Sequence, residues 1–423
     1  MKNASAFEPL CVTSLPKRLG DIEALTRRIG NDAERWKVRE VGDGNLNLVF
    51  IVEGSQGTAI VKQALPYVRL VGDSWPLPLK RSFFEYHALT RQAERDPGRV
   101  PEIYHFDEQQ ALIVMEFLSP HIILRKALIE GQVLPKIGCD LGLFAARTLF
   151  RGSDLSLEAA SRKKDLALFA DNIELCDITE NLVFTDPYFE AEMNRHTSPQ
   201  LDAVVANLRA DRDLKVEAQI LKQKFASNAE TLVHGDLHTG SVMVTAEDTR
   251  VIDPEFAFYG PMAFDVGMLL GNFWTAYFSQ AGHESEGSRD EMRDYLLGVC
   301  EEVWQVFTDE FTRLWHSERN GMLYPRTLFE DQGDELGAHQ ALDRMLAEIW
   351  RDLLGYAGVE MHRRILGLAH NAEFETIEDE ELRARCEAKA LAMGRHLVVN
   401  RHGIHSMSQA NALARRIEER FLP

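Results

Sequence analysis

The chain of 423 residues has few cysteines and no long apolar run. Its five cysteines are scattered, odd in number and free of any short metal-ligand spacing, which indicates free thiols in a reducing compartment. No stretch approaches the roughly 18 uncharged apolar residues of a membrane span. The first residues lead into mixed polar sequence without the apolar core of a signal peptide. We therefore expect a soluble, cytoplasmic protein without a membrane partner.

The sequence also has fewer positively charged than negatively charged residues. The sequence has 47 Lys and Arg against 66 Asp and Glu, a net charge of −19. This balance opposes non-specific binding to nucleic acid or to anionic lipid, so the expected partner is a small molecule. A phosphorylated ligand can still bind, because Lys, Arg and magnesium ions override the mean field locally.

The sequence shows neither an internal repeat nor a low-complexity segment. At roughly 100 to 200 residues per domain, its length predicts two lobes. Periodicity predicts an amino-terminal helix over 19–29, a second helix over 79–93 and short strands over 36–41, 48–52, 58–62 and 111–115. From residue 134 onward the pattern is mostly helical. We therefore predict an α+β fold, with a small antiparallel sheet lobe over 1–118 and a larger, mainly helical lobe over 119–423.

Two acidic blocks carry the clearest chemical signal. Asp236 lies in a His-Gly-Asp turn after the predicted strand 231–233, and Asp253-Pro254-Glu255 follows after a predicted hairpin that brings the blocks together. An isolated Asp beside a Gly is usually a turn residue. Together, the blocks indicate phosphoryl transfer, with Asp236 accepting the proton of a substrate hydroxyl. Asp253 and Glu255 are hard oxygen donors that suit magnesium.

Residues of the first lobe complete a kinase-like order. A glycine loop comes first, then a strand Lys, a helix Glu and a strand end, and the residues are Gly42, Gly44, Asn45, Lys62, Glu85, Glu116, Phe117 and Leu118. Taken singly, the loop is a common hairpin turn, and the Lys and Glu are common surface charges. In this order, the loop and Lys62 would hold the phosphates of ATP, with Glu85 as ion-pair partner of Lys62. Backbone groups of the 116–118 segment would hold the adenine edge.

The His-Gly-Asp-x-His loop over 234–238 resembles that of the choline kinase and aminoglycoside phosphotransferase branch of the protein-kinase-like fold. The segments 42–47, 62–68, 72–77 and 253–261 resemble the methylthioribose kinase family, and the resemblance spans nearly the whole chain. Two departures from the broader branch, Ser241 in place of Asn and Asp-Pro-Glu over 253–255, are shared with that family. We read His234 and His238 as loop architecture rather than zinc ligands.

The resemblance implies an enzyme that moves the γ-phosphoryl group of ATP, with Mg²⁺, to the 1-hydroxyl of S-methyl-5-thioribose in methionine salvage. It implies that Arg363 and Arg364 bind the sugar, that Asp253, Pro254 and Glu255 belong to the nucleotide side, and that the protein is a homodimer. The loop 75–78 would be a lid over the substrate, with Trp75 in contact with it.

Several alternatives stay open. Arg363 and Arg364 could be two surface cations, and Trp75 could belong to a packed loop. An aminoglycoside or choline phosphotransferase of the same fold would need a strongly acidic acceptor pocket. A non-catalytic pseudokinase would need a broken metal site.

Overall fold

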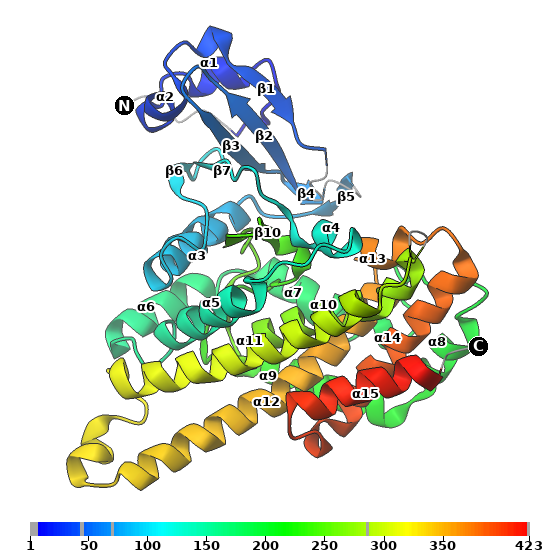
Figure 1. Cartoon of the computed structure of the whole chain (residues 1–423). Coiled ribbons are helices and arrows are strands. Elements are labelled where there is room, and N and C mark those ends of the chain that lie inside the picture. Colours follow the sequence, from blue (N-terminus) through cyan, green and yellow to red (C-terminus); the bar gives the residue numbers. More distant parts are fainter. Residues whose placement is uncertain (1–6, 43–45, 69–71, 285–286, 421–423) are drawn as a thin grey trace. The chain divides into compact units, whose positions relative to one another are not determined.

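The computed structural model describes residues 7–42, 46–68, 72–284 and 287–420 (Figure 1). Contacts divide the chain into two compact units. The first comprises Met1–His121, Asn172–Leu175 and Arg250–Ala257, and the second comprises Ile122–Asp171, Cys176–Thr249 and Phe258–Pro423. Two short segments from later in the chain thus belong to the first unit, and the division expected between residues 118 and 119 stays a prediction.

The first unit is built on an antiparallel five-stranded sheet. Its strands follow the order β1-β2-β3-β7-β6, with bounds β1 (Lys37–Glu40), β2 (Asn47–Glu53), β3 (Thr58–Ala64), β7 (Leu112–Glu116) and β6 (Ile103–Asp107). The four predicted strands are present. We did not predict β6, because all its side chains are half-buried and its sequence, Ile-Tyr-His-Phe-Asp, does not alternate between apolar and polar residues. The sheet places Lys62 opposite Val49 on β2 and Ile113 on β7.

Helices pack on this sheet. The predicted helix 19–29 is present from residue 23 onward as α2 (Glu23–Ile29), and a separate short helix, α1 (Leu15–Leu19), comes before it. Residues 20–22 separate the two helices, and the backbone of Ile22 is extended, with φ −77° and ψ 103°. Buried residues of both helices join Phe50 and Val61 of the sheet in one core cluster. The helix predicted over 79–93 is present as α3 (Arg81–Arg95).

The segment around Trp75 differs from the prediction of a loop. Trp75 and Pro76 end strand β5 (Gly72–Pro76), which pairs with β4 (Tyr67–Val68) in a separate two-stranded sheet. Proline is tolerated here because both strands of such a sheet are edge strands, which can lack a ladder donor. Trp75 is half-buried and Leu77 is buried, so this segment packs against the first unit.

The second unit is mainly helical, so the predicted fold class is confirmed. Its helices are α4 (Leu124–Ile129), α5 (Ile137–Arg151), α6 (Ala159–Phe169), α7 (Ile173–Leu182), α8 (Asp202–Ala210), α9 (Arg212–Ser227), α10 (Ala263–Ser279), α11 (Asp290–Ser317), α12 (Glu335–Leu366), α13 (Ala372–Glu375), α14 (Glu380–Asn400) and α15 (Met407–Arg420). The first turn of α7 belongs to the first unit. Short strands accompany them: β8 (Ile122–Ile123), β9 (Thr231–Val233), β10 (Val242–Val244) and β12 (Phe258–Gly260). Strand β11 (Thr249–Val251) begins in the second unit, and its last two residues belong to the first. The predicted hairpin is present as β10 and β11, which are neighbours in one sheet.

Helix α10 lies at the centre of the second unit. Every residue of α10 is buried, including Asp265 and Asn272, and the helix packs closely on α12. A helix that is apolar on all sides is typical of a protein core or a membrane. Across the described residues, no helix is both long and apolar enough to cross a membrane. The buried polar side chains of α10 therefore need partners inside the unit, and they mark the functional region described below.

Small residues set the distance between α12 and α14. A Cβ atom added to Gly358 would collide with the carbonyl oxygen of Gly394, and one added to Gly394 would lie 2.9 Å from the carbonyl oxygen of Gly358. This close approach fixes the carboxyl-terminal half of α12, which is buried from Leu353 to Leu366 and carries Arg363 and Arg364.

We predict that Gly358→Ala destabilises the protein by about 1–3 kcal/mol, because the added methyl group forces two backbones apart. Gly298→Ala is the matched control. Gly298 is exposed on α11 with open space around it, so alanine should stabilise the helix by roughly 0.5–1 kcal/mol. Urea unfolding of both variants measures the difference, and equal effects would contradict the close packing.

Candidate active site

The first unit gathers three carboxylates around one lysine. Oxygen atoms of Glu85, Asp253 and Glu255 lie within 4.8 Å of one another. The Lys62 ammonium donates to Glu85 at 2.8 Å and also bonds to Asp253. Lys62 and Glu85 are 11% and 3% exposed, whereas Asp253 is 45% exposed. The pairing of Lys62 with Glu85 agrees with the prediction, and Asp253 keeps an open side toward which a ligand can approach.

The charges of this cluster are strongly coupled. Burial opposes the charge of Lys62, but Asp253, Glu85 and Glu255 outweigh it and raise the pKa of the ammonium. Burial, reinforced by the neighbouring carboxylates, raises the pKa of Glu85 and of Glu255. Three carboxyl groups whose oxygen atoms lie this close together offer hard donors of the kind that a divalent cation such as Mg²⁺ prefers.

Backbone strain places Asp253. Its φ of 68° is in the left-handed region, which is rare for a residue other than glycine. Strained residues of this kind gather at functional sites, where the surrounding structure holds them in place. Pro254 is buried directly behind it and Glu255 is 3% exposed, so the Asp-Pro-Glu turn presents Asp253 outward and Glu255 inward.

Glu255 is held by two residues that we did not predict as part of the site. The Asn47 amide donates to Glu255 Oε2 at 3.1 Å, and Arg81 Nε lies 3.3 Å from the same oxygen. Arg81 is fully buried and also donates to the carbonyl oxygen of Leu46 at 2.6 Å, which joins Glu255 to the end of the glycine loop. The only sequence signal is the position of Arg81 at the start of a helix after a proline.

The glycine loop itself is only partly described. Gly44 and Asn45 lie outside the described residues. Gly42 is exposed, with open space on the side where a Cβ atom would project. The predicted phosphate contact of this loop therefore stays a prediction.

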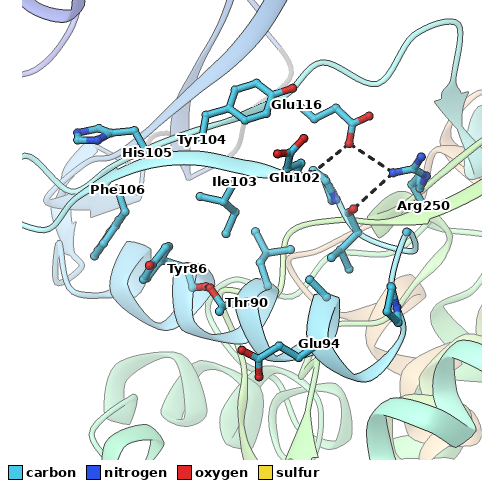
Figure 2. A pocket seen from close by; sticks show the side chains of 16 residues that line it. Tyr86, Thr90, Glu94, Glu102, Ile103, Tyr104, His105, Phe106, Glu116 and Arg250 are labelled. Carbon is cyan, nitrogen blue, oxygen red and sulfur yellow. Dashed lines mark hydrogen bonds and ion pairs between the residues drawn. The ribbon is translucent and has the colours of Figure 1, made fainter. Parts of the chain in front are cut away.

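A pocket of about 900 Å³ opens in the first unit between α3 and β6 (Figure 2). At one end of it, Arg250 Nη1 lies 3.3 Å from Glu116 Oε2. The backbone N–H of Glu116 donates to the carbonyl oxygen of Glu102 at 2.8 Å. Because that N–H is used within the sheet, any backbone N–H donor to an adenine edge would come from Phe117 or Leu118.

In the second unit, a tight turn presents Asp236. Gly235 has a φ of 85°, which glycine adopts without strain. The Asp265 carboxylate on α10 accepts the backbone N–H groups of His234 and Gly235 at 2.6 and 3.0 Å. The Ser241 hydroxyl donates to the carbonyl oxygen of Asp236 at 3.0 Å. Ser241 therefore braces the loop at the position where the broader branch carries an asparagine.

The Asp236 carboxylate is 21% exposed and lies beside two guanidinium groups and an imidazole. Arg363 Nη2 donates to Oδ1 at 2.7 Å, Arg364 Nη2 lies 3.8 Å from the same oxygen, and His238 Nε2 lies 3.2 Å from Oδ2. Burial opposes the charge of Asp236, but His238, Arg363 and Arg364 outweigh it and hold the pKa of Asp236 well below its usual range. Asp236 is therefore ionised at neutral pH.

Glu360 holds the two arginines in place. It is fully buried one turn before them on α12, and its carboxylate pairs with Arg363 Nε at 2.6 Å and Arg364 Nε at 2.7 Å. The Asn272 amide of α10 donates to it at 2.9 Å. Burial opposes ionisation, but the two guanidinium groups lower the pKa of Glu360 to about 2. We did not single out Glu360, although a spacing of three and four residues puts all three side chains on one helix face.

Comparison with known proteins shows the family of this chain. Residues 37–295 match the Phosphotransferase enzyme family, so the chain is a member of that family. It is 46% identical to methylthioribose kinase of Escherichia coli O45:K1, over 95% of this chain and 96% of the relative. It is also 43% identical to methylthioribose kinase 1 of Oryza sativa subsp. japonica, over 95% and 94%, and 42% identical to methylthioribose kinase of Geobacillus kaustophilus, over 94% of each. The chain belongs to the methylthioribose kinase family.

We predict that Arg81→Met lowers the free energy of unfolding by about 3–5 kcal/mol, because it leaves the buried Glu255 carboxylate without its guanidinium partner. Arg81→Met combined with Glu255→Gln should recover part of this loss, since the unpaired charge is gone. Arg39 is exposed on β1, so Arg39→Met should stay within about 0.5 kcal/mol of the parent. Urea unfolding without added metal measures the free energy of unfolding of the three variants. If the effects of the two substitutions simply add in the double variant, the pairing of Arg81 with Glu255 is contradicted.

Proposed function

We propose that this protein transfers the γ-phosphoryl group of ATP to the 1-hydroxyl of S-methyl-5-thioribose and releases S-methyl-5-thioribose 1-phosphate. The observation that carries the proposal is the ionised Asp236, held by Arg363 and His238 in a chain whose relatives are methylthioribose kinases over nearly its whole length. The acceptor hydroxyl would donate a hydrogen bond to Asp236, which orients its oxygen for attack and accepts its proton as the transfer proceeds.

The low pKa of Asp236 limits how strongly this carboxylate can act as a base. A carboxylate held well below its usual range is a weak base, so it draws little proton density from the hydroxyl early in the reaction. Phosphoryl transfer through a loose transition state needs little early deprotonation, and positioning contributes more. We therefore assign Asp236 first to orientation of the hydroxyl and second to acceptance of the proton.

On the nucleotide side, Lys62 would bind phosphate oxygens, and Asp253 and Glu255 would hold Mg²⁺. The supporting observation is the three-carboxylate cluster with one half-exposed member, Asp253. When bound, the metal would neutralise charge on the phosphates. Lys62 keeps its charge, and Glu85 keeps the Lys62 side chain directed into the cluster.

The two arginines take different parts in this proposal. Arg363 is engaged with Asp236 and Glu360. Among the described residues, Arg364 Nη2 is buried and has no hydrogen-bond partner. A buried guanidinium donor without an acceptor is costly unless a ligand supplies one. We assign Arg364 to the sugar hydroxyls and Arg363 to the orientation of Asp236.

The same pair of cations bears on the alternative acceptors. Choline and aminoglycosides are positively charged, and near Asp236 they would meet two buried guanidinium groups. A neutral sugar meets no such repulsion. The acceptor is therefore proposed to be neutral.

We further propose a cytoplasmic homodimer that acts in methionine salvage, with Trp75 near the sugar as part of a lid. All five cysteines are free thiols, which suits a reducing compartment. The net charge of −19 disfavours nucleic acid and anionic membranes as partners. The dimer rests on the family resemblance, and the lid rests on the tryptophan and the two prolines of residues 75–78, which make a stiff segment.

Asp236→Asn should lower kcat by about 10²–10⁴-fold while the affinity for ATP changes little, because the amide can neither accept the proton nor keep its ion pairs. Release of ADP with Mg²⁺ and ATP measures turnover on S-methyl-5-thioribose, ribose, choline and an aminoglycoside. Turnover on S-methyl-5-thioribose alone is expected. Turnover on choline or an aminoglycoside instead would discard the acceptor, and full activity of the variant would discard the role of Asp236.

Arg364→Met should raise the KM for S-methyl-5-thioribose at least about tenfold with the KM for ATP within twofold, since only the sugar loses a donor. Arg363→Met should act mainly on kcat, because Asp236 loses its closest cation. Arg344→Met is the control: Arg344 is exposed on the same helix. Initial rates with both substrates varied separate these effects. A larger shift in the KM for ATP would move Arg364 to the nucleotide.

A further inference from the structure

The imidazole of His238 is held by donors on one side. The backbone N–H of Gly240 donates to His238 Nδ1 at 2.9 Å, and the Arg125 guanidinium lies 3.4 Å from the same nitrogen. An amide N–H and a guanidinium can only donate, so Nδ1 must offer its lone pair. In a neutral imidazole, the proton then resides on Nε2.

The other side of the ring faces Asp236. His238 Nε2 lies 3.2 Å from Asp236 Oδ2, and Arg363 donates to Oδ1 of the same carboxylate. The two oxygens of Asp236 are therefore held by different donors, from the loop and from α12. A carboxylate fixed at both oxygens cannot rotate freely, so its remaining lone pairs point in set directions.

We propose that His238 is a positioning residue: its neutral imidazole, locked as the Nε2–H tautomer by the backbone of Gly240, orients the Asp236 carboxylate toward the acceptor hydroxyl. The proposal rests on the role assigned to Asp236 above. His238 itself acts through Asp236, and its contribution is the direction of one hydrogen bond.

A second layer of contacts keeps Arg125 against the ring. Arg125 Nε donates to Glu373 at 3.0 Å, and the Thr239 hydroxyl donates to the same Glu373 oxygen at 3.2 Å. Glu373 is fully buried on α13. This pairing places a permanent cation beside Nδ1, where a second proton would be repelled.

The charges around His238 favour its neutral form. Burial lowers its pKa to about 4, Arg364 and Arg125 act in the same direction, and Asp236 opposes them. Arg363 also faces Asp236. The carboxyl groups of Glu360 and Asp265 interact electrostatically with Asp236 as well. Because the pKa of His238 is lowered, the ring should stay neutral throughout pH 5–8, and the tautomer should not change over that range.

A purely structural role makes a different prediction. His238 is also the amino-terminal cap of the turn η3 (Thr239–Ser241), and that function uses only Nδ1. Asparagine places an acceptor near the position of Nδ1 but has no donor at Nε2. Glutamine reaches the position of Nε2 with an amide donor and loses the cap. The two variants therefore separate loop capping from orientation of Asp236.

We expect His238→Asn to lower kcat by about 10- to 100-fold, with the KM for ATP and the melting temperature nearly unchanged. His238→Gln should keep a kcat at least about fivefold higher than His238→Asn, although its melting temperature falls by roughly 1–3 °C through loss of the cap. The proposal would be overturned if His238→Asn and His238→Gln lost kcat equally and also lost melting temperature equally. Full activity of His238→Asn would overturn it too.

A measurement without turnover tests the tautomer directly. Nitrogen-15 NMR of histidine-labelled protein distinguishes a protonated from an unprotonated ring nitrogen, and the His238→Asn spectrum identifies the signal of His238. A protonated Nε2 and bare Nδ1 from pH 5 to 8 are expected. A proton on Nδ1, or titration of the ring near pH 6.5, would overturn the proposal even in an active enzyme. Absence of turnover on S-methyl-5-thioribose would instead overturn the proposed function and leave the tautomer unaffected.

Discussion

The ion pairs of Glu360 with Arg363 and Arg364 are the interaction on which the second unit's candidate site depends. Two buried guanidinium groups side by side repel each other and lose hydration, and a fully buried carboxylate at 2.6 and 2.7 Å offsets both costs. Without Glu360, Arg363 would have no fixed position beside Asp236. Asn272 of α10 and the glycines between α12 and α14 bring Glu360 to this point, so helix packing and electrostatics act together.

The first unit also relies on buried ion pairs, but with the charges reversed. There, the functional groups are carboxylates, and buried cations hold them: Lys62 pairs with Glu85 and Asp253, and Arg81 pairs with Glu255. The Asp253 carboxylate remains half-exposed, so a cation can approach it. In each unit, buried partners compensate most of the charge, and the uncompensated remainder is proposed to face the substrate.

Much of the fold could be predicted from the sequence, because β2, β3 and β7 are short runs rich in apolar residues and α3 has apolar residues at helical spacing. The failures have local physical causes. Strand β6 is half-buried on both faces and lacks alternation, and Trp75 and Pro76 belong to a strand although proline usually ends one. The helix predicted from residue 19 starts only at Glu23, because the backbone of Ile22 is extended. Periodicity reports burial on one face, so a strand such as β6, in which every side chain is half-buried, escapes it.

The sequence by itself determined which residues are proposed to carry the chemistry, since Asp236, Asp253 and Glu255 lie in short motifs whose spacing is set by local turns. Only the tertiary structure decided how these groups are held. Asn47 meets Glu255 across 208 residues, and Arg125 reaches His238 across 113. Such partners share no local pattern with the residues they hold, because the contact depends on packing between distant segments. The sequence therefore identifies the acidic residues, and the tertiary structure determines their ionisation and orientation.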